Sequence, residues 1–317
     1  MGNRATFVIV GAEGHERRSS SFGAVALDLD LLGGPEVVLP FALDHRLEER
    51  PWYDDDMCEA GVLIDPARRL LLVFAQEGPS VAMRTRAAWW RLLALAWPGW
   101  QLRWMHDGQS GLRDHLGMEP GHVRDTPYPG PVLEADDAEL ADPDPMAAVV
   151  TVGSGRCHVL AHIEDHPVAE GPALLDRLSD APGHARYPGR AEAGIHVDPA
   201  ARRVGWWLTG IVPHAAAMAA RWSGWTVDFW EDRWAEHERA SGGRFAPPAP
   251  DRAAALADVR DQALERWSGP RDDVRARLVA TLPHATIGHG FAPAVTGQRA
   301  AAARAAVERA YTAAVGT

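Results

Sequence analysis

The densest group of side chains that could bind a metal ion contains three histidines and two carboxylates in one short segment: His158, His162, Glu164, Asp165 and His166. Imidazole and carboxylate groups are common ligands of zinc and non-haem iron. The valine and isoleucine residues of the segment favour a strand, and on a strand a spacing of four residues holds His158 and His162 more than about 10 Å apart. We therefore favour incidental histidines on a strand edge over a metal site.

Two other groups combine side chains that could transfer protons. His106-Asp107 and Glu231-Asp232 each come at the end of an extended segment that follows a pair of tryptophans. General acid–base catalysis needs an acid and a base whose surroundings separate their pKa values. These four residues are the candidate catalytic residues if they face one another across a cleft. The alternative, which we favour, is that polar residues simply end a strand and begin a turn.

An acidic triplet beside an aromatic residue could bind a cation. Asp54, Asp55 and Asp56 follow closely on Trp52. Carboxylates coordinate divalent cations, and aromatic faces attract organic cations. These four residues are therefore candidate ligand-binding residues, and the alternative is a loop exposed to water.

Tryptophan is the most unusual component of the chain, with 13 residues. An exposed tryptophan can stack on an aromatic or cationic ligand, or anchor a protein partner. Trp207, Trp230 and Trp234 have no counterpart in the first half of the chain, and His196 stands where the first half has leucine. We predict that these four residues bind a ligand. Core packing is the alternative for most of the tryptophans.

The composition excludes several kinds of chemistry. The chain has no lysine, and all 32 basic residues are arginine, so it can form neither a pyridoxal-phosphate Schiff base nor a lysine-dependent P-loop. We predict no cofactor. The net charge of −11 argues against binding nucleic acid, and no apolar run approaches the roughly 20 residues that cross a bilayer. Two cysteines make no disulfide scaffold, and we expect a cytoplasmic protein.

Two sequence patterns occur twice in the same order, and they indicate the scaffold that positions these residues. Residues 59–67 (EAGVLIDPA) recur as 192–200 (EAGIHVDPA), and two arginines follow each copy. Residues 97–100 (WPGW) recur as 222–225 (WSGW), and an extended segment follows each copy. Internal similarity of this kind indicates a duplicated structural unit. Because Asp-Pro-Ala is typical of a turn, we predict a β-hairpin in each copy.

The two predicted hairpins differ in polarity. In the first, both strands are apolar on both faces, which predicts a central hairpin covered on both sides. In the second, His196 replaces Leu63 and Gly205 replaces Leu71, so one face is more polar or smaller. We also predict that the second turn has one extra residue, which a bulge or a longer loop must absorb to keep the register.

The expected architecture is α+β, with two diverged copies of one sheet-plus-helix module and a helical C-terminal extension. The first repeat spans residues 1–117, and the second spans 146–245. The segment 118–145 is rich in proline and aspartate and is predicted to be a linker. Residues 246–317 form the extension, which we expect to pack across the two modules.

Three functions fit these patterns. The first is a soluble protein that binds a small molecule or a protein partner at a site between or beside the repeats, as the duplication, the tryptophans and the lack of common catalytic motifs suggest. The second is an enzyme that uses histidine and carboxylate groups, or a bound metal, on a small molecule in the cleft between the repeats. The third is a structural role for the helical extension. We favour them in this order.

Overall fold

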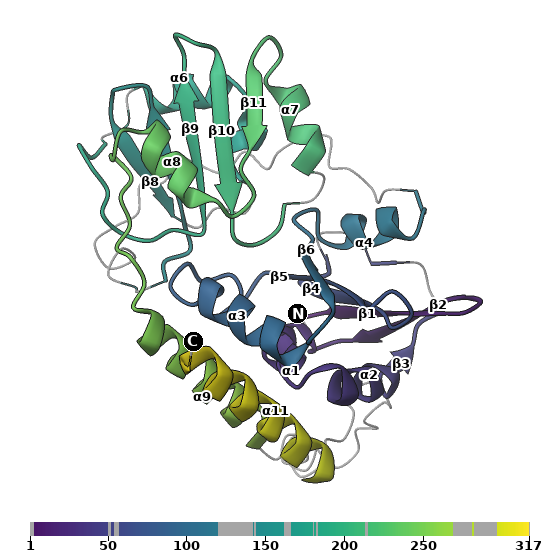
Figure 1. Cartoon of the computed structure of the whole chain (residues 1–317). Helices are drawn as coiled ribbons and strands as arrows, with labels where there is room; N and C mark the ends of the chain where they lie inside the picture. The colour runs from purple at the N-terminus through teal and green to yellow at the C-terminus, as the bar shows by residue number, and fades with distance from the viewer. Residues whose placement is uncertain are drawn as a thin grey trace. The chain divides into compact units, whose positions relative to one another are not determined.

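A computed structural model describes the protein over residues 3–49, 52–53, 57–119, 142, 144–161, 166–179, 181, 183–212, 215–268, 281 and 297–316 (Figure 1). The contacts divide the chain into two compact units. Unit 1 contains Met1–Val81, Thr85–Gly121 and Asp251–Thr317, and unit 2 contains Ala82–Arg84 and His122–Pro250. Among the described helices, none is long and apolar enough to cross a membrane.

Unit 1 contains a mixed sheet of six strands in the order β3-β2-β1-β4-β5-β6. Its elements are β1 (Ala5–Gly11), β2 (Gly14–Ser20), the 3-10 helix η1 (Ala24–Ala26), α1 (Leu27–Leu31), α2 (Pro35–Leu43), β3 (Arg46–Leu47), β4 (Ala60–Asp65), β5 (Leu70–Ala75), α3 (Arg86–Ala96), β6 (Gln101–Trp104), α4 (Gln109–His115), α9 (Arg252–Ser268) and α11 (Gly297–Val315).

Unit 2 contains a mixed sheet of five strands in the order β11-β10-β9-β7-β8. Its elements are β7 (Ala147–Val152), β8 (Cys157–Ala161), the 3-10 helix η3 (Pro167–Glu170), α6 (Ala173–Leu178), β9 (Ala193–Asp198), β10 (Arg203–Leu208), the 3-10 helix η4 (Ala215–Ala217), α7 (Met218–Arg221), β11 (Thr226–Phe229) and α8 (Trp234–Ala240).

The two sheets share one topology. The first strand of each unit pairs antiparallel with the second strand and parallel with the first hairpin strand, β4 or β9. The hairpin strands pair antiparallel, and the second of them pairs parallel with β6 or β11. The register also agrees, because Ala5 lies opposite Ala60 in unit 1, and Ala148 lies opposite Ala193 in unit 2. Each residue of one sheet core therefore has a defined counterpart in the other.

The tryptophan pairs make the same contacts in both units. The Nε1–H of Trp97 donates a hydrogen bond to the carbonyl oxygen of Leu31 at 2.7 Å, and that of Trp222 donates to Val168 at 2.8 Å. The second tryptophan of each pair packs edge-on against the first, with ring centroids 4.8 Å and 5.2 Å apart. These contacts and the shared topology support the predicted duplication, and the α+β fold class is confirmed.

The two hairpin turns have equal length. The ladder pairs Asp65 with Leu70 and Asp198 with Arg203, so four residues separate the strands in both units. The prediction of an extra residue in the second turn is therefore wrong. It came from matching the arginine pairs directly, whereas the structure places the second arginine of unit 2 in the strand.

Backbone geometry at the end of each turn explains this register. The last turn residue is left-handed in both units, with φ of 50° at Arg69 and 48° at Arg202. Left-handed residues of this kind redirect the chain into the second strand of a hairpin. Counting from them, Gly205 stands at the position of Leu72 and not of Leu71.

Helices cover one face of each sheet and form the main cores. In unit 1 this core includes α3 and extends to the C-terminal helices α9 and α11, where Val259 and Val307 are buried. Helices α9 and α11 lie side by side and both pack against α3 (Figure 1). In unit 2 the equivalent face packs against α6, α7 and their flanking turns. The opposite face of the first hairpin is also buried, so that hairpin is covered on both sides as predicted.

Candidate functional site

A row of three residues crosses each sheet at the same place, on the face that α4 or α8 covers. In unit 1 the row is apolar and buried, and in unit 2 it consists of two polar residues and a glycine. The rows are Val8, Leu63 and Leu72 in unit 1, and Thr151, His196 and Gly205 in unit 2. The sequence comparison predicted the changes at His196 and Gly205. The structure corrects the counterpart of Gly205 to Leu72 and adds Thr151.

The covering helices α4 and α8 are also equivalent, because each begins five residues after the end of the preceding strand. The fourth residue of the helix is Leu112 in unit 1 and His237 in unit 2, and both side chains are 0% exposed. A fourth apolar position of unit 1 is therefore a histidine in unit 2. The aromatic residue beneath the helix changes in parallel, from Phe74 to Trp207.

The polar residues of unit 2 form a continuous hydrogen-bond chain, which consists of Trp207, His237, Thr151 and His196. The indole Nε1–H of Trp207 donates to Nδ1 of His237 at 3.0 Å. Nε2 of His237 lies 2.7 Å from Oγ1 of Thr151, and the same oxygen lies 2.8 Å from Nδ1 of His196. The first three side chains are buried, and His196 is half-buried at the end of the hydrogen-bond chain.

Burial keeps both imidazoles of the hydrogen-bond chain neutral. It lowers the pKa of His237 to about 3, with smaller contributions from the nearby His196 and His166. Burial also lowers the pKa of His196, although the carboxylate of Asp198 acts in the opposite direction and Arg244 adds to the lowering. A buried imidazole loses hydration when it is charged, which is why both shifts have this sign.

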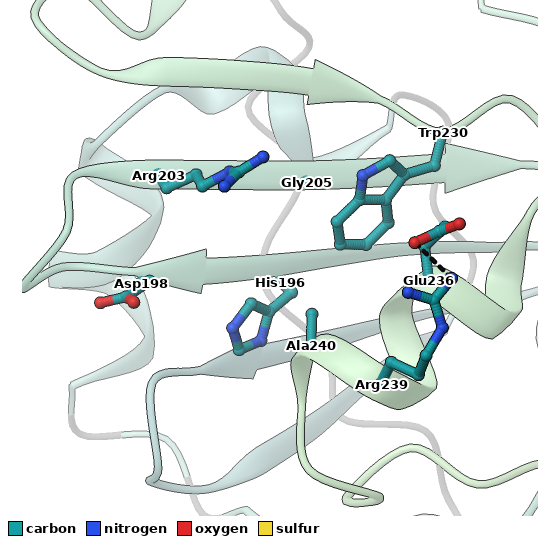
Figure 2. A pocket seen from close by; sticks show the side chains of 8 residues that line it. All are labelled: His196, Asp198, Arg203, Gly205, Trp230, Glu236, Arg239 and Ala240. Atoms are coloured by element: carbon teal, nitrogen blue, oxygen red, sulfur yellow. Dashed lines mark ion pairs between the residues drawn. The ribbon is translucent and has the colours of Figure 1, made fainter.

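The hydrogen-bond chain ends at a pocket of about 420 Å³ on the surface of unit 2. Figure 2 shows its lining residues, which come from β9, β10, the end of β11 and the helix α8. They are His196, Asp198, Arg203, Gly205, Trp230, Glu236, Arg239 and Ala240. Pockets that bind small molecules commonly occupy about 300–1,000 Å³, so this one is large enough for a small ligand.

The indole of Trp230 lies on the sheet at Gly205, and Figure 2 shows this indole and the imidazole of His196 among the side chains that line the pocket. A Cβ atom at position 205 would overlap the Trp230 ring, so glycine is required for this placement. The equivalent residues of unit 1 are Leu72 and Met105. Tryptophan and glycine thus replace them as a complementary pair.

The backbone after Trp230 is strained. Glu231 has a φ of 56°, which is uncommon for a residue other than glycine and costs about 1–3 kcal/mol. The amide of Trp230 donates to the carbonyl oxygen of Trp206 at 2.7 Å, and the Glu231 carbonyl accepts from the amide of Leu208 at 3.0 Å. These two hydrogen bonds hold Trp230 against β10.

The charged side chains of the pocket form ion pairs or accept hydrogen bonds from the amides of the hairpin turn. Arg239 pairs with Glu236 at 2.6 Å, and Arg203 pairs with Asp228 at 2.7 Å. Oδ1 of Asp198 accepts from two amides of the hairpin turn. The carboxylates near the pocket therefore already have donors, and a ligand would find aromatic surface and hydrogen-bond donors there.

The predicted catalytic residues fall in different units. His106 and Asp107 follow β6 in unit 1, and Glu231 and Asp232 follow β11 in unit 2, at equivalent positions. Their proposed meeting across a cleft stays a prediction. Glu231 is exposed, and its contribution to the pocket comes from its backbone.

The predicted ligand-binding tryptophans occupy three kinds of position. Trp230 lines the pocket, whereas Trp207 is fully buried and donates to His237. Trp234 is partly buried, with its ring centroid 6.1 Å from that of Trp207. Both faces of the hairpin are covered in unit 2, which is why Trp207 reaches no surface.

Trp52 lies in unit 1 beside two arginine side chains of the same protein. The guanidinium groups of Arg17 and Arg113 lie 5.1 Å and 5.9 Å from the Trp52 ring centroid. The aromatic ring predicted to attract a cationic ligand therefore already contacts two arginines. The acidic residues predicted to act with it lie outside the described residues: Asp54, Asp55 and Asp56.

The histidines of the predicted metal group have separate positions. His158 lies on β8 opposite Val150, and His162 lies outside the described residues. Nδ1 of His166 accepts from the amide of Val168 at 3.1 Å, and Nε2 lies 3.0 Å from the carbonyl oxygen of Trp207, to which it donates. Both nitrogens of His166 are thus used to cap η3 and to hold β10.

Sequence reasoning missed Thr151 and His237, although a signal for both was present. Each stands where unit 1 has an apolar residue, Val8 or Leu112, once strand and helix equivalences are extended beyond the hairpin.

Within the described residues, no group of three or more His, Cys, Asp or Glu side chains is placed to hold a metal ion. No known protein-family model, curated protein or solved structure matches the chain.

Proposed function

We propose that this protein binds a small molecule with a planar ring in the pocket of unit 2, where Trp230 and His196 form the floor. The observation that carries the proposal is the replacement of an apolar cluster by a polar one. Unit 1 builds the same scaffold with Val8, Leu63 and Leu112, whereas unit 2 has a threonine and two histidines at these positions.

The scaffold itself gives no reason for this replacement. Buried polar side chains are costly unless every hydrogen bond is made, and apolar residues of similar size often stabilise a protein more. Residues that depart from the local packing rule are therefore expected at functional sites. In unit 2 the threonine and the two histidines belong to one hydrogen-bond chain that ends at the pocket, which supports a binding role there.

The surroundings of the pocket also favour a small planar ligand. Trp230 offers an aromatic surface on which a ring can stack. Along the sides, the arginine–carboxylate pairs of Arg239 and Arg203 balance their charges, so the site does not select strongly for a charged ligand. A planar, largely neutral molecule that can accept hydrogen bonds fits this combination best.

The proposal is tested by screening planar heteroaromatic compounds, such as indoles, purines, pyrimidines and pterins, by ligand-observed NMR and thermal shift. Compounds that bind the native protein should lose about tenfold or more in affinity to Trp230→Met, which introduces the residue of unit 1. Trp225→Phe, a tryptophan change in the same unit outside the pocket, serves as the control and should leave binding unchanged. Binding that survives Trp230→Met but not the control change would place the site elsewhere.

A further inference from the structure

The hydrogen-bond chain has a direction, because one of its ends can only donate. The indole Nε1 of Trp207 is a donor without acceptor capacity. Nδ1 of His237, 3.0 Å away, must therefore carry no proton. The neutral imidazole of His237 then has its proton on Nε2, which points to Oγ1 of Thr151 at 2.7 Å.

The hydroxyl of Thr151 accepts one hydrogen bond and donates the next one along the hydrogen-bond chain. Its oxygen accepts from His237, and its single proton is directed to Nδ1 of His196 at 2.8 Å. Thr151 is 0% exposed, so the hydroxyl has no water with which to exchange partners. Nδ1 of His196 is thus an acceptor, and the neutral ring has its proton on Nε2.

The outer nitrogen of His196 remains available to a ligand. Among the described residues none bonds to Nε2, while the ring itself lines the pocket. The groups that face His196 are Thr151 from β7, His237 from α8 and Asp198 from its own strand, with Arg244 further away.

We infer that Thr151, His237 and Trp207 are positioning residues that hold His196 as a neutral Nε2–H donor. The ligand is consequently one whose planar ring has a hydrogen-bond acceptor, either a carbonyl oxygen or an unprotonated ring nitrogen. This ligand class rests on the proposed function, whereas the tautomer of His196 does not. A donor at this position also makes His196 unsuited to act as a general base through Nε2.

The tautomer is measured on the ligand-free protein by ¹⁵N NMR of labelled histidine at pH 8, with His196 assigned through the signal lost in His196→Leu. We expect an unprotonated Nδ1 and a protonated Nε2 at both His196 and His237. Thr151→Ser retains the hydroxyl and should preserve the tautomer. Thr151→Val should reduce the ratio of the Nε2–H tautomer of His196 to its Nδ1–H tautomer about fivefold to tenfold. A proton on Nδ1 of either histidine in the native protein overturns the inference.

The ligand class is measured with two probes of the same shape. Indole and 7-azaindole differ by one ring nitrogen that accepts a hydrogen bond, and 7-azaindole should bind about fivefold to tenfold more tightly to the native protein. This preference should disappear in His196→Leu. Equal binding of the two probes to the native protein overturns the acceptor preference. If neither probe binds, the proposed function loses support, and the tautomer is still decided by NMR.

Discussion

Replacing His237 by leucine is expected to destabilise unit 2 more than replacing the complete hydrogen-bond chain by the residues of unit 1. In the single variant, the indole N–H of the buried Trp207 loses its acceptor. An unsatisfied buried donor costs about 1–3 kcal/mol. Thr151 still has His196 as a partner, so the free energy of unfolding should fall by about 1–3 kcal/mol.

The fourfold variant introduces the unit 1 residue at each position: Thr151→Val, His196→Leu, Trp207→Phe and His237→Leu. It removes every donor and acceptor of the hydrogen-bond chain together, and such complete replacements are nearly neutral or stabilising. The smaller phenylalanine ring leaves a void of roughly 40 Å³, which costs about 1 kcal/mol at about 24 cal/mol per Å³. We therefore expect the fourfold variant to unfold within about 1 kcal/mol of the native protein.

Hydrogen exchange of the amides of β9 and β10 is the suitable measurement, because it reports the opening of unit 2 within the full chain. Val8→Thr in unit 1 is the matched control, and it is read from the amides of β1 and β4. It buries a hydroxyl beside Leu63 and Leu112 in place of the two histidines, and it should destabilise unit 1 by about 1–3 kcal/mol. The reasoning is refuted if the fourfold variant is less stable than His237→Leu, because the two units would then not be interchangeable at these positions.

Three further predictions concern pH and packing. The pKa of His237 is about 3 in the folded protein and 6.5 ordinarily, so the unfolded state takes up a proton first and the free energy of unfolding decreases as the pH falls from 6.5 towards 3. In acid titrations of unfolding, His237→Gln should reduce this decrease between pH 6.5 and 4 by about 3 kcal/mol. Burial, with Asp144 and Asp142 nearby, raises the pKa of Glu192 to about 7, so the free energy of unfolding decreases as the pH rises through 7. Glu192→Gln should stabilise the protein by about 2 kcal/mol at pH 8.5 and leave its stability unchanged at pH 4. Gly205→Ala should displace Trp230 and lower the free energy of unfolding in urea by about 1–3 kcal/mol. Gly297→Ala, whose added Cβ meets no atom of the described residues, should be neutral or slightly stabilising.

The repeated sequence patterns predicted much of the fold, because they contain the residues that build it. The Asp-Pro turns and the tryptophan pairs located both hairpins, and the indoles of Trp97 and Trp222 make equivalent hydrogen bonds. The register of the second hairpin could not be read in the same way. Either of two neighbouring arginines can adopt the left-handed conformation, and only the ladder shows that Arg202 does so.

The site was less accessible to sequence reasoning, because its parts come from separate elements. His196 and Trp230 could be recognised by their difference from the first repeat. Thr151 lies in the first strand of unit 2, outside the two repeated motifs, and His237 lies in a short helix after a turn whose sequence differs between the units. Their partnership depends on the register between β7 and β9 and on the packing of α8, which are tertiary features.

Three unrelated departures from good packing meet at the pocket. Imidazoles and a hydroxyl occupy apolar positions, a glycine interrupts the strand β10, and Glu231 is held in a left-handed conformation. Each weakens the fold by a different mechanism, through desolvation, backbone entropy and steric strain. At the equivalent positions unit 1 has none of them, since it has Leu72 within the strand and an ordinary φ at His106. The meeting of these three departures around Trp230 and His196 is what selection for a ligand at this position would produce.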